Sequence, residues 1–436
     1  MNNHMDIPWH EYTKVNSKVK IEDASLTEKS SVIGRIGLML LACGTGAWRV
    51  RSSMNTIASE LNITCIADIG LTNISYTCID GIESHAQSLS LHNTSVNTSK
   101  LARMEDFVYH FKDECKTCTC NEIHDQLDQI ESIHSSYSPI ILGLAAALAC
   151  SCFTFLLGGG PIEMLCAFVG AGLGNTLRMK LIKHNYTLFL NVAASVSLAC
   201  LVYALLFNFL EACFGIATQH EAGYICSMLF IIPGFPFITS GIDLAKLDLR
   251  SGLERLAYAI IIILAATLTA WICALVLHLQ PVDFVKLHIS TSTKLLLRLL
   301  TSFGGVFGFS IMFNSSKKIA ASAGYIGAIA NTLRLTLVDL SLPAAAAAFI
   351  GALTAGLLAS MIKGNTGYPR IAVTVPSIVI MVPGLYMYRA IYNLELTSTM
   401  SIGANWLIQS LLIVLALPMG LIFARILTDP SFRYCT

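Results

Sequence analysis

Charged residues are scarce in this sequence. Asp, Glu, Lys and Arg make up 13% of its 436 residues, whereas 54% are hydrophobic, and a soluble globular protein carries roughly 25% charged residues. The low charge predicts that much of the chain contacts lipid. The sequence contains no block of Lys and Arg, and its formal net charge is only +1. It therefore indicates no nucleic-acid partner.

Several functional motifs are also missing. The first residues, MNNHMDIPWHEYTKVNSKVK, lack the basic flank and apolar run of a secretory signal, so we expect the N-terminal region to stay in the cytoplasm. The chain has no P-loop and no Gly-x-Ser-x-Gly motif. Its apolar segments hold no dense cluster of His, Asp and Glu. These absences argue against an enzyme and against a bound cofactor, although they leave open a separate ATPase subunit.

Fourteen cysteines are present, and most are expected to be buried, reduced side chains, since a cytoplasmic or membrane setting implies no disulfide framework. One group has ligand types that suit zinc: Cys115, Cys118, Cys120 and His124. It lacks the second, distant cluster of a paired zinc knuckle, and it lies in a charged link between two predicted helices. We predict solvated thiols here and no metal.

Ten apolar stretches follow Pro139, and most approach the roughly 20 residues that cross a bilayer. They cover residues 140–157, 161–179, 187–210, 223–244, 255–278, 295–313, 318–338, 342–362, 371–393 and 404–425. The sequence thus predicts an all-α polytopic membrane domain of about ten helices. The second and seventh stretches are the weakest, so nine or eleven spans remain alternatives.

Residues 1–138 lack these long apolar stretches, and their pattern predicts a small α+β domain. They contain 17 acidic and 11 basic residues, a net charge of −6. An apolar-periodic segment from Leu26 to Leu61 predicts one long or two short helices. TCIADI, NISYTCI and HAQSLSL, separated by turn signals, predict three antiparallel strands. Amphipathic helices are expected at 99–114 and 121–134.

The membrane part shows signs of an internal repeat. GNTLRMKL (174–181) is matched by ANTLRLTL (330–337), and IIPGFP (231–236) is matched by MVPGLY (381–386). The offsets of 156 and 150 residues predict two halves of five spans, at 139–291 and 292–436. An odd number of spans per half makes the halves face opposite ways, which is the inverted-repeat plan of many secondary transporters.

Loop charges predict the orientation. With the N-terminal domain inside, twelve Lys and Arg residues of the membrane part fall on the cytoplasmic side and five fall outside. Because basic residues are retained on the cytoplasmic side, both termini are expected to be cytoplasmic. The protein is then expected in the plasma membrane, which is the inner membrane of a bacterium.

Three segments resemble the threonine/serine exporter family. They are CGTGAWRVRSSMNTIASELNI (43–63), with a Gly-x-x-x-Arg-Val pattern, and the two Pro-Gly segments IPGFPFITSGIDL (232–244) and TVPSIVIMVPGLYMYRAIYNL (374–394). The resemblance covers nearly the whole chain. It implies ten spans and export of small amino acids, or of dicarboxylates such as succinate in a related two-subunit exporter, driven by protons or the membrane potential. The family often has an acidic residue after Arg-Val, where this chain has Arg51.

Proline and glycine inside the fourth and ninth spans predict broken helices, since each Pro removes a backbone donor. The residues are Pro233, Gly234 and Pro236 in the fourth span and Pro376, Pro383 and Gly384 in the ninth. Freed backbone groups at membrane depth must be buried in protein or face a water-filled cavity. A packing kink is the alternative, but the symmetry of the pair favours a substrate-binding site.

Polar residues near these breaks are candidates for the same site. Arg389 is the candidate for a substrate carboxylate, and Glu163 and Asp243 are candidates for the substrate ammonium or the coupling proton, because burial raises the pKa of a carboxyl. Asn175 and Asn331, which the repeat makes equivalent, either line the pathway or join helices. Each charged residue has a membrane-interface anchor as its alternative role.

Tyr386 and Tyr388 are typical of an aromatic belt at the membrane surface. Together these residues favour a secondary exporter that contacts membrane lipid and carries a small-molecule substrate. The sequence does not decide whether the protein forms a homo-oligomer. A membrane-anchored sensor of a cytoplasmic ligand is the alternative from another class.

Overall fold

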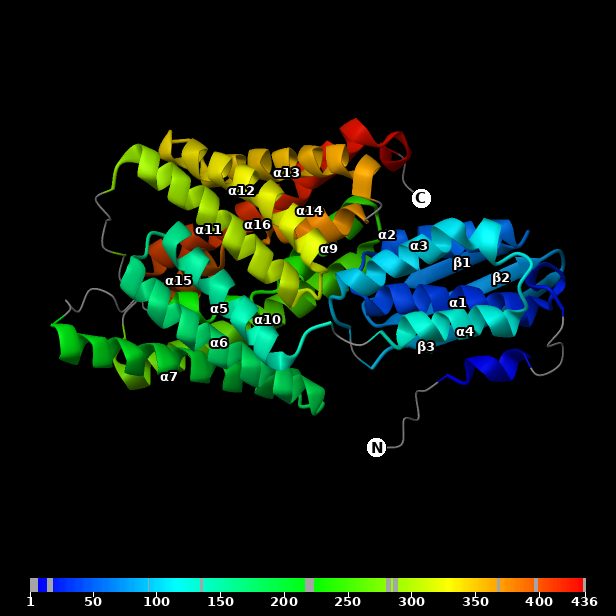
Figure 1. Ribbon diagram of the computed structural model, residues 1–436, viewed down its shortest axis with the longest axis horizontal. Helices are drawn as coiled ribbons and strands as arrows, with labels where there is room; N and C mark the ends of the chain where they lie inside the picture. The colour runs from blue at the N-terminus through cyan, green and yellow to red at the C-terminus, as the bar shows by residue number, and fades with distance from the viewer. Residues whose placement is uncertain are drawn as a thin grey trace. The chain divides into compact units, whose positions relative to one another are not determined.

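The computed structural model has two compact units, which are described separately. One comprises residues 1–136, 239–255 and 434–436, and the other comprises residues 137–238 and 256–433. Descriptions below refer to residues 7–13, 19–92, 94–133, 136–215, 223–279, 284, 289–366, 369–395 and 399–433. Figure 1 shows both units with their labelled elements.

The first unit contains the predicted α+β fold. Helix α1 (Leu26–Ala42) begins with a capping box between Ser25 and Glu28, which satisfies backbone donors that the first turn leaves free. Gly44 has a φ of +80°, a conformation that glycine adopts without strain, and the chain turns there into α2 (Ala47–Glu60). The apolar segment therefore forms two helices.

Three antiparallel strands follow in the order β1–β2–β3: β1 (Thr64–Ile69), β2 (Asn73–Asp80) and β3 (Glu83–Ser90). Alternate residues of β1 and β2 are buried, as expected for a sheet with one covered face. Helices α1 and α2 contact the sheet. Helices α3 (Thr98–Glu114) and α4 (Cys120–Glu131) pack against α1, which lies between the sheet and α4 (Figure 1).

A short segment from the membrane part also belongs to the first unit. Residues 239–255 contain the end of α9 (Gly234–Ala245) and the start of α10 (Leu249–Leu277). The two helices are joined by a tight turn in which Leu247 has a φ of +64°. The predicted first membrane half, residues 139–291, includes this segment, whereas its contacts group it with the N-terminal elements.

The second unit is helical. Two short helical turns, α8 (Gly223–Ser227) and η4 (Leu229–Ile231), precede the break before α9. A 3-10 turn follows the last helix of this unit at Pro430–Arg433. The first unit has two further 3-10 turns, at Trp9–Thr13 and Ile21–Asp23. The other helices of the second unit are α5 (Pro139–Leu156), α6 (Pro161–Lys183), α7 (Leu188–Phe214), α11 (Thr291–Met312), α12 (Lys317–Asp339), α13 (Ala344–Thr366), α14 (Arg370–Val379), α15 (Gly384–Glu395) and α16 (Met400–Thr428).

Six helices among the described residues are long and apolar enough to cross a membrane: α5, α7, α10, α11, α13 and α16. The count is eight if each bent pair, 223–245 and 370–394, forms one span. Helices α6 and α12 each have 23 residues, a length of about 34 Å, but they are less apolar. Their crossing, and with it the count of ten, stays a prediction.

Small residues bring α5 and α11 close together at the centre of this unit. A Cβ added to Gly308 would lie 2.5 Å from the carbonyl oxygen of Ala145, and one added to Gly304 would lie 2.9 Å from Sγ of Cys152. Such close backbone approach is the usual way in which membrane helices associate. Leu205, Phe209 and Leu300 are instead among the exposed hydrophobic side chains, as expected for a lipid-facing surface.

Candidate functional site

The first helix break lies at Pro233. The N–H of Gly234 donates to the carbonyl oxygen of Ile232 at 2.8 Å, which closes a three-residue turn around the proline. The N–H of Phe237 then donates to the carbonyl oxygen of Pro233 at 3.2 Å and starts the next helix. The segments on either side are bent by 58°.

The second break repeats this geometry at Pro383. The N–H of Gly384 donates to the carbonyl oxygen of Val382 at 2.9 Å, and the N–H of Met387 donates to the carbonyl oxygen of Pro383 at 3.0 Å. The bend is 49°. The two Pro-Gly pairs therefore produce the interruptions predicted from the sequence, with the same local hydrogen bonds.

Two prolines that were expected to break helices do not. Pro376 lies inside α14, so the ninth-span break comes later, between α14 and α15. Pro236 lies in the first turn of α9, where the missing N–H costs no helical hydrogen bond. The breaks thus depend on Pro233 and Pro383.

The two breaks pack against each other. A Cβ added to Gly384 would lie 1.8 Å from Cδ1 of Ile232, beside the first break. One added to Gly234 would lie 3.1 Å from Val379 and 3.4 Å from Val382, beside the second. Each glycine thus leaves room for a side chain from the opposite break, and the two interruptions form one site.

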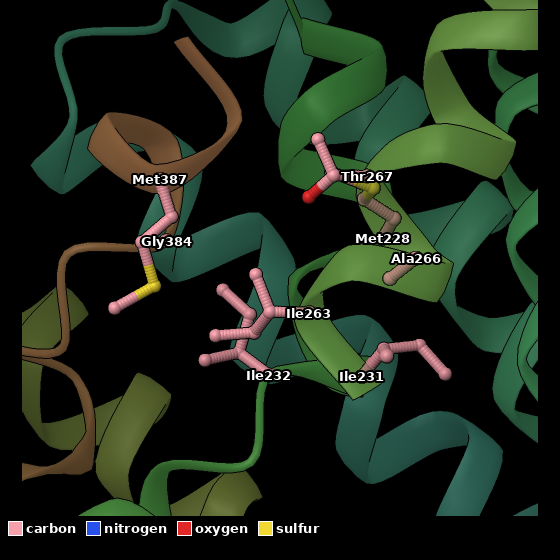
Figure 2. A pocket seen from close by; sticks show the side chains of 8 residues that line it. All are labelled: Met228, Ile231, Ile232, Ile263, Ala266, Thr267, Gly384 and Met387. Carbon is pink, nitrogen blue, oxygen red and sulfur yellow. The ribbon is translucent and has the colours of Figure 1, made fainter. Parts of the chain in front are cut away.

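A small cavity adjoins this contact (Figure 2). Its lining comes from both broken segments and from α10, and consists of Met228, Ile231, Ile232, Ile263, Ala266, Thr267, Gly384 and Met387. Its volume is about 10 Å³, roughly the space of one water molecule. The side chain of Thr267 is the one polar group of this lining. A larger solute would need the helices around the cavity to move.

A pair of tyrosines joins the same two helices, α8 and α15. The hydroxyls of Tyr224 and Tyr388 lie 2.7 Å apart, and both side chains are fully buried. The assignment of Tyr388 to an interfacial belt was therefore wrong, because its hydroxyl is engaged inside the protein. Tyr386 contacts the ring of Trp406, with centroids 4.8 Å apart.

Glu163 and Arg389 make different local contacts. The Glu163 carboxylate is buried and accepts a hydrogen bond from the N–H of Gly160 at 2.9 Å, at the start of α6. The Arg389 guanidinium lies over the ring of Trp406, 5.3 Å from its centroid. Arg389 lies on α15, which follows the second break.

The equivalent amides Asn175 and Asn331 make equivalent contacts. Nδ2 of Asn175 donates to the carbonyl oxygen of Leu142 at 2.8 Å, which joins α6 to α5. Nδ2 of Asn331 donates to the hydroxyl of Ser302 at 2.9 Å, which joins α12 to α11. Both amides therefore link neighbouring helices, and their part in substrate binding stays a prediction.

Asp243 has different surroundings, within the first unit. Its Oδ2 accepts hydrogen bonds from the N–H of Ala47 at 3.2 Å and from the hydroxyl of Ser251 at 3.0 Å, and pairs with Nε of Arg255 at 3.2 Å. Arg255 also donates to the carbonyl oxygens of Gly44 and Thr45. Oδ1 of Asp243 has no hydrogen-bond partner among the described residues.

Ion pairs connect the same segment to the N-terminal elements. Arg51, the departure from the family pattern, pairs with Asp248 at 2.5 Å, and the N–H of Leu71 donates to Glu254 at 2.6 Å. Sequence reasoning did not find Arg255 or Tyr224 as site residues. Two features of the sequence could have indicated these residues. Arg255 is a basic residue at the start of an apolar span, and Tyr224 carries a hydroxyl a few residues before the Pro-Gly break.

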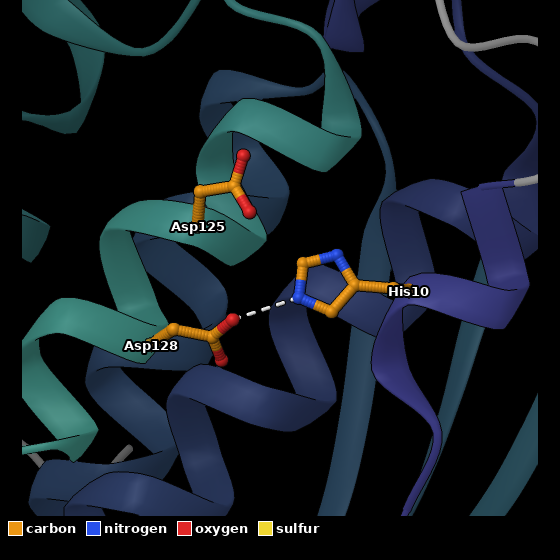
Figure 3. Close-up of side chains that lie close together, drawn as sticks. All are labelled: His10, Asp125 and Asp128. Atoms are coloured by element: carbon orange, nitrogen blue, oxygen red, sulfur yellow. Dashed lines mark hydrogen bonds and ion pairs between the residues drawn. The ribbon is translucent and has the colours of Figure 1, made fainter.

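A group of potential metal ligands lies elsewhere in the first unit (Figure 3). His10, Asp125 and Asp128 bring their ligand atoms within 4.8 Å of one another. However, Nδ1 of His10 bonds Asn121 at 2.7 Å and its Nε2 bonds Asp128 at 2.8 Å. Asp128 also pairs with Arg35. Both ring nitrogens are thus engaged, and the group forms an ion-pair network.

The cysteine and histidine group from the sequence does not assemble into a ligand cluster among the described residues. His124 contacts Ser31 and Arg35, Cys120 contacts Glu28, and Cys115 contacts Gln126. The contacts of these side chains are therefore those of a packed helix interface, and the prediction of solvated thiols is wrong for Cys115 and Cys120, which are buried.

The fold and the paired breaks define an integral membrane protein of many helices, organised as a transporter is. The family model described as "Putative threonine/serine exporter" matches residues 31–277, more than half of the chain, and the model "Threonine/Serine exporter, ThrE" matches residues 298–427. The chain belongs to the threonine/serine exporter family, a family of transporters.

Two curated proteins are similar to the chain. A "Probable threonine/serine exporter" of Mycobacterium tuberculosis is 22% identical over 432 residues, which cover 95% of this chain and 79% of that protein. An "Uncharacterized protein" of Haemophilus influenzae is 26% identical over 168 residues, 35% of this chain and 56% of that protein. No solved structure matches.

Proposed function

We propose that this protein is a secondary exporter of threonine and serine, driven by protons or the membrane potential, with its substrate site between the two helix breaks. The observation that carries the proposal is the reciprocal packing of Gly234 and Gly384 against the opposite break. Broken helices that meet inside a membrane domain provide backbone groups and helix ends for a polar solute. The name of the mycobacterial relative supports the substrate class.

The proposed architecture is ten spans in two inverted halves. Its support is the order of elements, since α5, α6, α7, the pair α8–α9 and α10 are followed by α11, α12, α13, the pair α14–α15 and α16. Each half has its bent pair in the fourth place. With both termini in the cytoplasm of a bacterial cell, alternating access would consist of the two halves moving about the breaks.

The proposed residue roles follow from charge and burial. Arg389, on the helix that follows the second break, would hold the substrate carboxylate, and the buried carboxylate of Glu163 would hold its ammonium. Asp243 would carry the coupling proton. Its support is full burial together with an Oδ1 that lacks a partner among the described residues, since such an oxygen can accept a proton without losing a hydrogen bond.

Transport into inside-out membrane vesicles tests the proposal. Export then becomes uptake, and labelled threonine, serine and succinate can be compared with and without an imposed proton gradient. We expect uptake of threonine and serine. Pro233→Ala and Pro383→Ala should each lower uptake about tenfold or more, because a continuous helix removes the site. Pro418→Ala is the matched control, since Pro418 lies inside the unbroken helix α16.

The outcomes separate the alternatives. Uptake of succinate without threonine or serine would make the protein a dicarboxylate exporter. If none of the three solutes moves although the protein is inserted, the exporter proposal is wrong and a membrane-anchored sensor becomes the better explanation. Equal effects of Pro233→Ala and Pro418→Ala would show that the breaks are only packing kinks.

A further inference from the structure

The hydroxyls of Tyr224 and Tyr388 form a direct hydrogen bond between α8 and α15. Tyr224 is one turn before Met228, and Tyr388 is one turn after Gly384, and both of those residues line the cavity. The two rings meet edge to face with centroids 5.8 Å apart. The pair therefore bridges the two broken segments, one turn along the chain from residues that line the cavity.

The hydrogen-bond count of this pair is incomplete. A phenol has one proton to donate and can accept hydrogen bonds at its oxygen. Two hydroxyls therefore carry two protons, and their mutual hydrogen bond uses one. Among the described residues, neither hydroxyl has another hydrogen-bond partner, and both side chains are fully buried. One of the two buried O–H protons therefore has no acceptor among the described residues, and an oxygen of a bound solute could accept it.

The surroundings narrow the chemistry of that ligand. Arg389 follows Tyr388 directly on α15, so a zwitterion whose carboxylate is held by Arg389, as proposed above, would lie close to the tyrosine pair. The group needed there accepts the free phenol proton and fits between two hydroxyls. An alcohol does both, because it accepts from one phenol and donates to the other.

We propose that Tyr224 and Tyr388 form the subsite that recognises the side-chain hydroxyl of the substrate. This inference rests on the proposed function and names the residues that set its specificity. The two phenols bond each other, and the substrate hydroxyl would insert into that bond. A methyl group at the same place breaks the phenol bond and replaces it with nothing, so an isosteric substrate without the hydroxyl is rejected.

Threonine and valine are the matched pair that tests this subsite, because they differ only in a hydroxyl against a methyl group. Uptake of labelled threonine into inside-out vesicles would be competed with unlabelled threonine, serine, valine and succinate. We expect wild-type protein to prefer threonine over valine by roughly 100-fold, which is less than the roughly 10⁴-fold that the most selective hydrogen-bonding sites achieve. Tyr224→Phe and Tyr388→Phe, which remove one hydroxyl each, should lower that ratio about tenfold or more.

Tyr386→Phe is the control variant. Tyr386 lies on the same helix, two residues before Tyr388, but its ring packs on Trp406 and is partly exposed. We expect it to keep the wild-type ratio. If the two subsite variants instead lower uptake of all solutes equally, or leave the ratio of threonine to valine unchanged, the tyrosine pair only joins helices and the proposal is overturned.

Binding to the purified full-length protein separates this proposal from the proposed function. Displacement of labelled threonine by valine can be measured in detergent, without transport. Selective threonine binding that Tyr224→Phe weakens about tenfold would support the subsite even if vesicles show no uptake, in which case the exporter proposal fails alone. If wild-type protein shows neither binding nor uptake of threonine, both proposals fail. Selective binding of succinate that the Tyr→Phe variants reduce would also overturn the hydroxyl assignment.

Discussion

The carboxylate of Asp243 accepts a hydrogen bond from the backbone N–H of Ala47, although 196 residues separate the two. Ala47 is the first residue of α2, and the N-cap of that helix, Gly46, has no side chain to satisfy its free donors. Asp243 supplies the missing acceptor, and its charge also suits the positive end of the helix. The C-terminal end of α9 therefore completes a helix of the N-terminal region.

Asp243→Asn tests this relationship. The amide keeps the shape and an acceptor oxygen, but leaves the buried guanidinium of Arg255 without its counter-charge. Removing one partner of a buried ion pair costs roughly 3 kcal/mol, so we expect a clear fall in the melting temperature of the purified full-length protein. The amide hydrogens at the start of α2 should also exchange faster.

Glu254→Gln is the control for that experiment. Glu254 accepts from the N–H of Leu71 and pairs with Arg250, but its side chain is partly exposed. An exposed pair contributes roughly 0–1 kcal/mol, so the melting temperature should change little. Equal losses in the two variants would mean that Asp243 has no special part in holding α2.

The contact between the two breaks can be tested by one substitution that introduces a steric clash and a second substitution that removes it. Gly384→Ala places a methyl group 1.8 Å from Cδ1 of Ile232, so one of the broken segments must shift. We expect uptake in vesicles to fall about tenfold, because small displacements at a binding site cost that much or more. Gly234→Ala should be milder, since its nearest neighbour would be 3.1 Å away.

Ile232→Val provides the rescue, because valine lacks the Cδ1 atom that meets the new methyl group. The double variant Ile232→Val with Gly384→Ala should recover most of the uptake that Gly384→Ala loses, and Ile232→Val alone should be close to wild type. Residues in contact show such coupling in double-mutant cycles. Strictly additive effects would indicate that the breaks do not touch in the membrane.

Hydropathy and proline patterns predicted much of this fold, for physical reasons. Lipid requires long apolar helices, so α5, α7 and α16 appear within a few residues of their predicted limits. A proline inside such a helix removes a donor, so the breaks at Pro233 and Pro383 were also predictable. Pro376 was not distinguished from them, because a proline is tolerated inside α14 and only the packing decides where the chain bends.

The site was harder to predict than the fold. Tyr388 near the end of a span has the same sequence pattern as an interfacial aromatic residue, and its partner Tyr224 is 164 positions away. The pairing of Asp243 with Arg255 and Ala47 likewise depends on tertiary contacts that periodicity in a single sequence does not carry. Charge type could nominate Glu163 and Arg389, but it could not reveal that Arg389 lies over the ring of Trp406.

His124 makes the first unit sensitive to acid. Burial, together with the positive charge of Arg35, lowers the pKa of His124 to about 3, and Asp128 and His10 also face it. The folded protein holds this ring neutral, whereas the unfolded chain binds a proton below about pH 6.5. Stability from His124 is therefore complete above that pH and is lost as the pH falls towards 3, by roughly 1.4 kcal/mol per pH unit.

Hydrogen exchange of the full-length protein at about pH 7.5 and about pH 5 measures this effect, after correction for intrinsic exchange rates. We expect α4 and α1 to lose protection at the lower pH in the wild type. His124→Gln, which stays neutral and keeps a hydrogen-bonding group towards Ser31, should show a much smaller change. An unchanged pH response in that variant would assign the acid sensitivity to another group.

The role proposed for Arg389 predicts a graded response to substitution. A guanidinium binds a carboxylate through two parallel hydrogen bonds, whereas an ammonium offers a single charge centre. We expect Arg389→Lys to raise the KM for threonine uptake about tenfold with a smaller change in the maximal rate, and Arg389→Gln to abolish measurable uptake. Arg425→Lys is the matched control, because Arg425 also lies over an aromatic ring, that of Phe432 at 4.3 Å. If Arg389→Gln transports threonine with the wild-type KM, the substrate carboxylate is held by another group.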